Sequence, residues 1–476
     1  MAEKGNGEKA VRSGFWYVVS NVLIRAVGII TAPIYTRLLT TAETGYANNF
    51  NNYVSIFTVI TCLCLIYSVG RAKLDFKQDF DAYMSSIQAL SSGFALIVLL
   101  LMAIFCPADG MLLFPRHIVL LLFAYLALYP SIDYMQYKYR FSYQYKENIL
   151  ISVIICITTV FATVGLIFLM PHDKGYAKIL GTVLPGMAVA LWCYINLLRK
   201  GKTLVNLEYW GYALKIGLPM IPHGLALILL ARIDTTMISK YCTFGDVGLY
   251  TSGYTIGTLL MFITNAVSQA WLPWFNEKLY ADKTSEIREK NKILMFYGCV
   301  LTILFIMAAP EAVKILFAPP YWDAMWVVPP VALGTLCQYF YTNYVNAELF
   351  TGNTALIAIN SIIAAVINIG LNAYYIPRYG YIAAAYTTLA GYFILMVLHC
   401  LSMRFILRMK IYDDILYFIL MLLTSALGIG AAALYNNCIM RYVLAAGTAV
   451  AIIIFRRRDA AFLINRLKTR GNKELS

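Results

Sequence analysis

The chain repeats part of its own sequence at an offset of about two hundred residues. Residues 36–60 align without a gap with residues 239–263, at an offset of 203. Residues 165–186 align with residues 370–391 at an offset of 205, with seven identities in 22 positions. Because two separate matches share nearly the same offset, they indicate that the chain arose by internal duplication.

The composition places the chain in a membrane. Hydrophobic residues make up 61% of its 476 residues and charged residues only 13%. A soluble protein of this composition would leave too much apolar surface in water. Crossing a hydrocarbon core of about 30 Å takes about 20 apolar residues, and we count about fourteen such segments. The sequence therefore predicts an all-α polytopic membrane protein with about 14 transmembrane helices.

The repeat also predicts how these spans are organised. Six spans separate the two copies, so both copies enter the membrane in the same direction, and a pseudo-twofold axis along the membrane normal should relate the halves. The expected parts are a disordered cytoplasmic tail (1–14), an N-terminal lobe of spans 1–6 (15–198), a cytoplasmic linker (199–211), a C-terminal lobe of spans 7–12 (212–407), spans 13 and 14 (408–456), and a basic cytoplasmic tail (457–476).

Positive charge predicts the orientation. Most Lys and Arg residues fall in segments on the same side as the N-terminus, which places both termini in the cytoplasm and the protein in the inner or plasma membrane. The net charge of +14 is then a topology signal and a contact with anionic membrane lipid, so we expect no nucleic-acid partner. The sequence leaves the oligomeric state open.

The sequence holds no motif that indicates an enzyme or a cofactor site. We find no Gly-rich phosphate loop, nucleophile elbow or metal-ligand helix, and the ten cysteines lack metal-site spacing. The longest segment outside the predicted spans, residues 275–291, is too short for a catalytic domain. We therefore expect no metal and no cofactor.

Charged residues inside the predicted spans are the first candidate site residues, because such charges are rare and usually functional. Arg25 lies near the middle of span 1, in a polar or small stripe with Asn21, and must face water or an anion. Arg232, Lys215 and Lys314 are the other candidate cations. There are two alternatives. Arg25 could form an internal ion pair that locks the lobes together, and Lys215 could extend its side chain to the membrane interface.

Span 7 is unusual because it combines charges with two prolines. Pro219 and Pro222 predict a break in the helix. Arg232 and Asp234 are two residues apart and cannot face the same side, so they should not form an internal salt bridge. Candidates for ion coupling or gating are His223, Asp234 and Glu348, with an ordinary hydrogen-bonded histidine as the alternative for the first.

Spans 2 and 10 are rich in amides and tyrosines, which together provide the hydrogen-bonding groups and flat apolar faces that a sugar requires. The alternative is interhelical hydrogen bonding with an aromatic belt at the interface. If the first interpretation holds, the polar residues facing a shared water-filled cavity are Asn49, Asn52, Tyr341 and Asn346, with Asn21 of span 1.

Several motifs, in order and spacing over spans 1–12, resemble the polysaccharide transporter family, the Wzx-type flippases. Thr235 is a departure, since the family often has a basic residue there. The motifs are Gly14-Phe15-Trp16-Tyr17, the stretch from Pro33 to Thr40, Glu43-Thr44-Gly45-Tyr46, Leu218-Pro219-Met220-Ile221-Pro222-His223-Gly224, Val247-Gly248-Leu249-Tyr250, Gln269-Ala270-Trp271-Leu272-Pro273-Trp274, and Ile376-Pro377-Arg378-Tyr379-Gly380.

The resemblance implies a fold like that of multidrug and toxic-compound extruders, within the multidrug/oligosaccharidyl-lipid/polysaccharide exporter superfamily. It implies as cargo an oligosaccharide on polyprenyl diphosphate, moved from the cytoplasmic to the outer leaflet by alternating access for cell-surface polysaccharide synthesis. Cations would hold the diphosphate, amides and tyrosines the sugars, and the polyprenyl tail would stay in lipid. Coupling to H⁺ or Na⁺ stays open. The alternatives are a cation-coupled drug or metabolite antiporter and, from another class, a membrane glycan polymerase or ligase.

Overall fold

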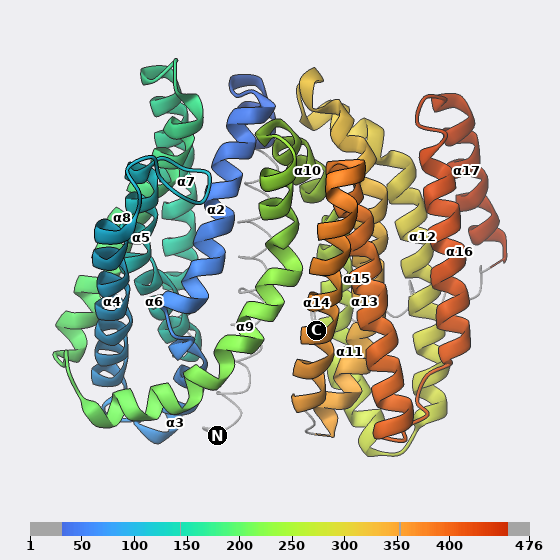
Figure 1. Ribbon diagram of the computed structural model, residues 1–476. Coiled ribbons are helices and arrows are strands. Elements are labelled where there is room, and N and C mark those ends of the chain that lie inside the picture. Colours follow the sequence, from blue (N-terminus) through green and yellow to red (C-terminus); the bar gives the residue numbers. More distant parts are fainter. Residues whose placement is uncertain (1–30, 143, 352–353, 456–476) are drawn as a thin grey trace, which may run out of the picture.

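The computed structural model describes residues 31–142, 144–351 and 354–455 (Figure 1). These residues form helices and one isolated β-bridge, between Met111 and Phe114, which confirms the predicted all-α class. The first half contains α2 (Thr41–Thr61), η1 (Leu65–Ser68), α3 (Val69–Asp75), α4 (Phe80–Phe105), α5 (Arg116–Leu128), α6 (Pro130–Phe141), α7 (Tyr145–Leu169) and α8 (Lys174–Gly201). The second half contains α9 (Leu207–Tyr241), α10 (Phe244–Gly257), α11 (Leu260–Tyr280), α12 (Thr284–Leu316), η2 (Pro319–Val327), α13 (Val328–Phe350), α14 (Thr354–Tyr379), α15 (Tyr381–Leu401), η3 (Ser402–Ile406), α16 (Asp414–Ala432) and α17 (Cys438–Phe455).

The chain is a multi-pass membrane protein. Among the described residues, nine helices are long and apolar enough to cross a membrane, or ten if the bent pair Thr41–Thr61 and Leu65–Asp75 is one span. Most of the predicted first span, residues 15–36, lies outside the described part, and the long helices α9 and α13 are not among the nine. The number fourteen stays a prediction.

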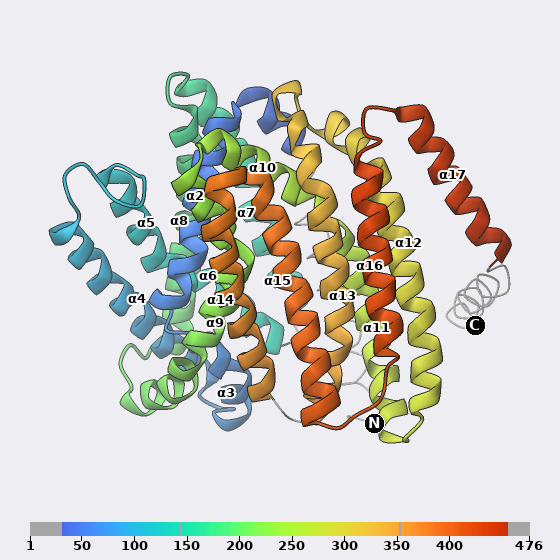
Figure 2. The ribbon, with the colours of Figure 1, turned by 45° about the vertical axis from the view of Figure 1, so that its right-hand side comes forward.

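The helices stand in two groups with α2, α9 and α10 between them (Figure 1). Helices α4 to α8 lie on one side, and α11 to α17 on the other. Each group has buried apolar clusters of its own, one centred on Leu65, Tyr83 and Leu197, and another on Phe275, Phe340 and Tyr417. Figure 2 shows α17 standing apart beyond α12 and α16. It is attached to α12 through Arg441, which donates to Glu311 and to the Met307 carbonyl.

Helix α9 runs unbroken from Leu207 to Tyr241, so the break predicted from its two prolines is wrong. Pro219 and Pro222 are both exposed and lie within the helix. Each proline removes one backbone hydrogen bond, and the remaining bonds are sufficient to continue the helix with a bend. Figure 1 shows α9 curving from beneath the first group toward α10.

The loop before α16 is held against α12 by side chains outside the spans. Arg288 donates to the carbonyls of Lys410 and Ile411, at 2.6 and 3.3 Å. Lys292 forms an ion pair with Asp413 at 2.8 Å. The hydrogen bond from Lys292 lowers the pKa of the Asp413 carboxyl. This end of the second group is therefore held by charge as well as by the apolar packing of Ile411 and Tyr412.

The first repeat corresponds to two helix starts with the same capping chemistry. Before α2, the Glu43 N–H donates to Thr40 Oγ1 at 3.2 Å and the Thr40 N–H donates to Glu43 Oε2 at 2.7 Å. Before α10, Thr243 and Asp246 form the same reciprocal pair. Such a capping box satisfies two backbone donors that a helix start leaves open. The duplicated Thr and acidic residues therefore begin two equivalent helices.

These two helices cross at the closest approach that glycine allows. A Cβ at Gly45 of α2 would lie 1.7 Å from the carbonyl oxygen of Phe244, and a Cβ at Gly248 of α10 would lie 2.1 Å from the carbonyl oxygen of Thr41. Gly45 and Gly248 are equivalent positions of the repeat, and so are Thr41 and Phe244. Each contact is therefore the counterpart of the other. The next equivalent pair, Asn48 and Thr251, is joined by a hydrogen bond of 2.8 Å. The contact between α2 and α10 is therefore reciprocal.

The second repeat corresponds to two pairs of adjacent helices. Helix α7 packs along α8, and α14 packs along α15, each pair joined by a short turn. The turn before α15 contains Gly380 at φ +74°, a conformation that glycine adopts readily. Both repeat segments thus fold into the same unit, which is two neighbouring helices joined by a tight turn.

Replacement of the crossing glycines should destabilise the protein. We expect Gly45→Ala or Gly248→Ala to cost about 1–3 kcal/mol, because the methyl group meets a backbone carbonyl that cannot move alone. Gly165→Ala is the matched control, since a Cβ there meets nothing within 4 Å. It should be neutral or stabilising by up to about 1 kcal/mol through helix propensity. Thermal unfolding in detergent measures the difference, and equal midpoints for all variants would contradict it.

Candidate functional site

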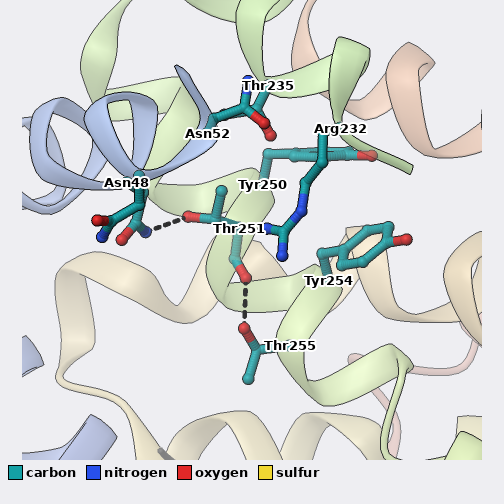
Figure 3. A pocket seen from close by; sticks show the side chains of 9 residues that line it. Asn48, Asn52, Arg232, Thr235, Tyr250, Thr251, Tyr254 and Thr255 are labelled. Atoms are coloured by element: carbon teal, nitrogen blue, oxygen red, sulfur yellow. Dashed lines mark hydrogen bonds between the residues drawn. The ribbon is translucent and has the colours of Figure 1, made fainter. Parts of the chain in front are cut away.

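A polar cavity of about 220 Å³ lies where α2, α9 and α10 meet (Figure 3). Its walls are amides, hydroxyls and one cation, from the two repeat-equivalent helices and from the helix between the groups. The residues that line it are Asn48, Asn51 and Asn52 of α2, Arg232 and Thr235 of α9, and Tyr250, Thr251, Tyr254 and Thr255 of α10.

Arg232 is the cation in this cavity. Figure 3 shows its side chain extending from α9 to a position between Thr251 and Tyr254. The side chain is exposed and makes no ion pair or hydrogen bond with any residue that the structure describes. An arginine inside a membrane costs about 3 kcal/mol even on the lenient insertion scale. A guanidinium held at that cost without a partner among the described residues is a candidate for binding an anion.

A second cation lies beside the cavity on α8, although it does not line the cavity. Lys178 Nζ donates to Asn48 Oδ1 at 3.5 Å and lies 5.5 Å from the centre of the Tyr35 ring. Asn48 in turn donates to Thr251 across the α2–α10 contact. The cavity therefore has one cation in its wall and a second cation that contacts Asn48 from behind the wall.

Asp234 lies behind the cavity wall, on the other side of α9 from Arg232. It is 1% exposed and accepts from Tyr250 Oη at 2.6 Å, from Asn372 Nδ2 at 2.6 Å and from Thr388. Arg232 and Asp234 form no ion pair, as expected for two residues that are two positions apart on a helix. Tyr250 both lines the cavity and donates to Asp234. It therefore links the cavity to the buried carboxylate.

Hydroxyls and amides of α14 and α15 extend the environment of Asp234. Asn372 Nδ2 also donates to Asn368 Oδ1 at 3.2 Å, and Thr387 donates to Asn372 Oδ1. Each of these groups is at least nine-tenths buried. The result is a carboxylate bonded to two hydroxyls and one amide nitrogen, with further amide and hydroxyl oxygens behind them and no basic partner within ion-pair distance among the described residues. Oxygen-rich clusters of this kind suit hard cations or a proton.

The asparagines of α2 have different environments. Asn52 lines the cavity and donates from Nδ2 to Thr236 Oγ1 at 2.6 Å. Asn49 is fully buried, and its Oδ1 accepts from Ser239 at 3.2 Å, inside the contact between α2 and α9. Asn49 therefore makes a hydrogen bond between helices and does not line the cavity. A role in sugar binding stays a prediction for both.

Tyr341, Asn346 and Glu348 lie on α13 and do not line this cavity. Glu348 is fully buried and hydrogen-bonded to His399 Nδ1 at 2.8 Å. The Tyr341 ring stacks on His399, with ring centres 5.6 Å apart. Asn346 is buried in the same helix. Tyr341, Glu348 and His399 form a second polar cluster between α13 and α15, separate from the first.

The other predicted site residues lie elsewhere. Lys215 is exposed on α9, and Lys314 is exposed near the end of α12, 5.5 Å from the centre of the Trp322 ring. His223 lies within α9, and its side chain is not described. Arg25 and Asn21 lie outside the described residues. Of the four predicted diphosphate cations, Arg232 is therefore the one that the described structure places in this cavity.

Two features of the site were missed from the sequence. Neither Lys178 nor Thr251 was singled out. A signal for Thr251 was present, because Asn48 and Thr251 occupy equivalent positions in the repeat. Equivalent positions near a twofold axis face each other, so a polar pair there predicts a polar contact on that axis.

Comparison with known proteins identifies the family. A family described as polysaccharide biosynthesis protein matches residues 10–279, which is more than half of the chain. The chain belongs to this family. No curated protein matches the chain.

Solved structures show the fold that this family member shares. Lipid II flippase MurJ, in an inward closed conformation, is similar with a TM-score of 0.69 at 14% identity, covering 94% of this chain and 99% of that chain. An inward-facing multidrug resistance MATE family transporter of the MOP superfamily has a TM-score of 0.60 at 14% identity, covering 86% and 98%. The Vibrio cholerae MATE transporter VcmN has a TM-score of 0.53 at 12% identity, covering 86% and 98%. At these identities the likeness establishes the fold, which is that of flippases and transporters.

Loss of the Tyr250 hydroxyl should destabilise the Asp234 cluster. Tyr250→Phe removes one of three side-chain donors to a buried carboxylate, and we expect a cost of about 1–3 kcal/mol. The matched control is Tyr379→Phe, whose side chain is 70% exposed. Thermal unfolding of the purified proteins measures both. An unchanged midpoint for Tyr250→Phe would show that this hydrogen bond contributes nothing.

Proposed function

We propose that the protein is a flippase that moves polyprenyl-diphosphate-linked oligosaccharide from the cytoplasmic to the outer leaflet for cell-surface polysaccharide synthesis. The family match and the transporter fold support a lipid-linked cargo. MurJ, which has the same fold, is named as a lipid II flippase. The observation that carries the proposal is Arg232, which lies in a polar cavity between the two groups of helices and has no partner among the described residues.

The cavity chemistry suits the diphosphate part of this cargo. Arginine binds phosphate oxygens through a planar fork of donors, and Lys178 adds a second positive charge beside Asn48. A volume of about 220 Å³ equals roughly seven waters at about 30 Å³ each. That is room for a small anionic group and too little for an oligosaccharide. Transport therefore requires the groups of helices to separate at this point.

Alternating access supplies that separation. We propose that residues 15–198 and 212–407 move as two six-span lobes related by a pseudo-twofold axis along the membrane normal, with 199–211 as their linker and 408–456 as an appended pair of spans. The reciprocal Gly45 and Gly248 contacts support an axis between α2 and α10. The polyprenyl tail would remain in lipid while the head group passes between the lobes.

The Asp234 cluster is the proposed site of ion coupling, with H⁺ or Na⁺ as the ion. It is buried next to the cavity and joined to it through Tyr250. Occupation of Asp234 by a cation would change the hydrogen bonds of Tyr250, which lines the cavity. His223 and Glu348 remain further candidates for coupling or gating.

The specific test is transport by Arg232 variants in vesicles that contain lipid-linked oligosaccharide. Arg232→Ala should lower leaflet exchange per folded molecule at least about tenfold, which corresponds to about 1.4 kcal/mol of lost interaction. Arg232→Lys should retain part of the activity, because charge remains while the fork is lost. Lys314→Ala is the matched control, since Lys314 lies outside the cavity. Full activity in Arg232→Ala would remove Arg232 from the proposal, and no exchange by wild type would refute the flippase itself.

The proposed orientation, with both termini in the cytoplasm, has its own test. The segment 277–290 should then be cytoplasmic, and Asp173 and Asp323 should face outside. In a variant without native reactive cysteines, Asp323→Cys should react with an impermeant maleimide on intact cells, and Lys283→Cys should react only after the membrane is opened. Both positions are exposed. Labelling of position 283 from outside would reverse the orientation.

A cation-coupled antiporter of the same superfamily is the second candidate, because Asp234 provides a buried carboxylate next to the cavity. The two functions differ in the charge that the cavity should attract. Arg232 and Lys178 favour an anionic cargo, and a cationic drug would be repelled. Drug efflux by wild type that survives Arg232→Ala would favour the antiporter.

A further inference from the structure

A second cavity lies where the span that begins with α2 is broken. Leu63 and Cys64 have φ values of 51° and 52°, in the left-handed region that non-glycine residues rarely adopt. The chain bends by 57° between α2 and the helix that follows. Across from this break, Pro130 begins α6 and marks an irregular point between α5 and α6. Two irregular helices thus face each other inside the first group.

The space between them is a cavity of about 210 Å³. Cys62 and Cys64 line it from the break, Asp133 and Tyr134 from α6, and Gly224 and Ile228 from α9. Helix α9 fits closely here, because a Cβ at Gly224 would lie 3.4 Å from Cys64 Sγ. Asp133 is the one charged residue in the described lining. A carboxylate in this position is unexpected, since the walls are mostly apolar.

Asp133 has no partner of opposite charge among the described residues. No ion pair or hydrogen bond joins it to another described residue, and Lys138, the next cation along α6, already pairs with Asp81 at 2.7 Å. The Tyr134 hydroxyl is 1% exposed and also lacks a hydrogen-bond partner among the described residues. Among the described residues, the titratable groups that face Asp133 are Cys62, Cys64 and Tyr67 of the broken segment, Tyr134 of α6, Tyr125 of α5, and Tyr129 between α5 and α6. None of these groups carries a positive charge.

An unpaired carboxylate in such surroundings must acquire a cation. A metal ion would need several oxygen ligands, as the Asp234 cluster has. The Asp133 cavity instead offers two thiols, two tyrosines, Thr58 and otherwise apolar side chains. A proton needs one acceptor only, so the lining favours a proton over sodium.

We propose that Asp133 is a reversible proton-binding site of the first helix group, separate from the Asp234 cluster. The site follows from the cavity and does not depend on the cargo. Its use in transport rests on the proposed function: α9 supplies one wall here and Arg232 in the other cavity, so movement of α9 would change the surroundings of Asp133 and its proton occupancy together.

Infrared difference spectroscopy of the full-length protein in lipid tests the site directly. Titration with acid and base should show a protonated-carboxyl C=O band that is absent in Asp133→Asn and present in Asp109→Asn, a control at an exposed loop carboxylate. Asp133→Glu should keep the band at a shifted frequency and a shifted titration midpoint. This variant keeps the test decisive if Asp133→Asn does not fold.

Exchange of sodium for choline at constant pH and ionic strength separates the two cations. The Asp133 band should be unaffected by this exchange. A band that disappears when sodium is added would assign the site to sodium and overturn the proton proposal. Identical spectra for wild type and Asp133→Asn would overturn the site.

Leaflet exchange driven by a pH gradient then tests whether the site is coupled to transport. Coupling is supported if Asp133→Asn loses the dependence of exchange on the pH gradient and retains exchange in the absence of a gradient. If the band is found and wild type still moves no lipid-linked glycan, the cargo is wrong and the site stands.

Discussion

The crossing of α2 and α10 is the contact that positions the rest of the site. Lipid does not drive helices together as water does, so helices in a membrane associate where small residues let their backbones approach. Gly45 and Gly248 provide this on both sides of one crossing, each opposite a backbone carbonyl of the other helix. Matching capping boxes begin both helices, which fixes where along each helix the glycines fall. The polar cavity lies just beyond this point because Asn48 and Thr251 are then brought face to face.

Helix α9 gives the cavity its charge and separates that charge from the buried carboxylate. Arg232 and Asp234 are two residues apart, which is about 200° around a helix of about 3.6 residues per turn. One side chain therefore faces the cavity, and the other is buried against α14 and α15. Asp234 is stabilised by three side-chain donors, whereas Arg232 has no partner among the described residues. This asymmetry supports the proposed anionic cargo, because the cation remains available and the carboxylate does not.

The sequence was informative about the site where a residue's role depends on its own helix. The opposite directions of Arg232 and Asp234 follow from their spacing alone. Residues whose role depends on a distant helix were harder to assign. Asn49 and Asn52 look alike in the sequence, yet one is enclosed by Ser239 and the other opens to the cavity. Lys178 near a span end and Asp133 after Pro130 resemble ordinary interface charges until the neighbouring helices are in place.

What the sequence by itself determined is the class, the duplication and the family resemblance, because hydrophobic length, repeat offset and motif order are properties of the chain read in one dimension. It also determined the two helix starts, since a capping box forms within four consecutive residues. Only the tertiary structure decided which polar residues share a space. Tyr341 and Asn346 were grouped with Asn52 by composition, and packing placed them in a different helix contact. The physical reason is that a cavity is the space left between helices far apart in sequence, and its lining is set by how those helices cross.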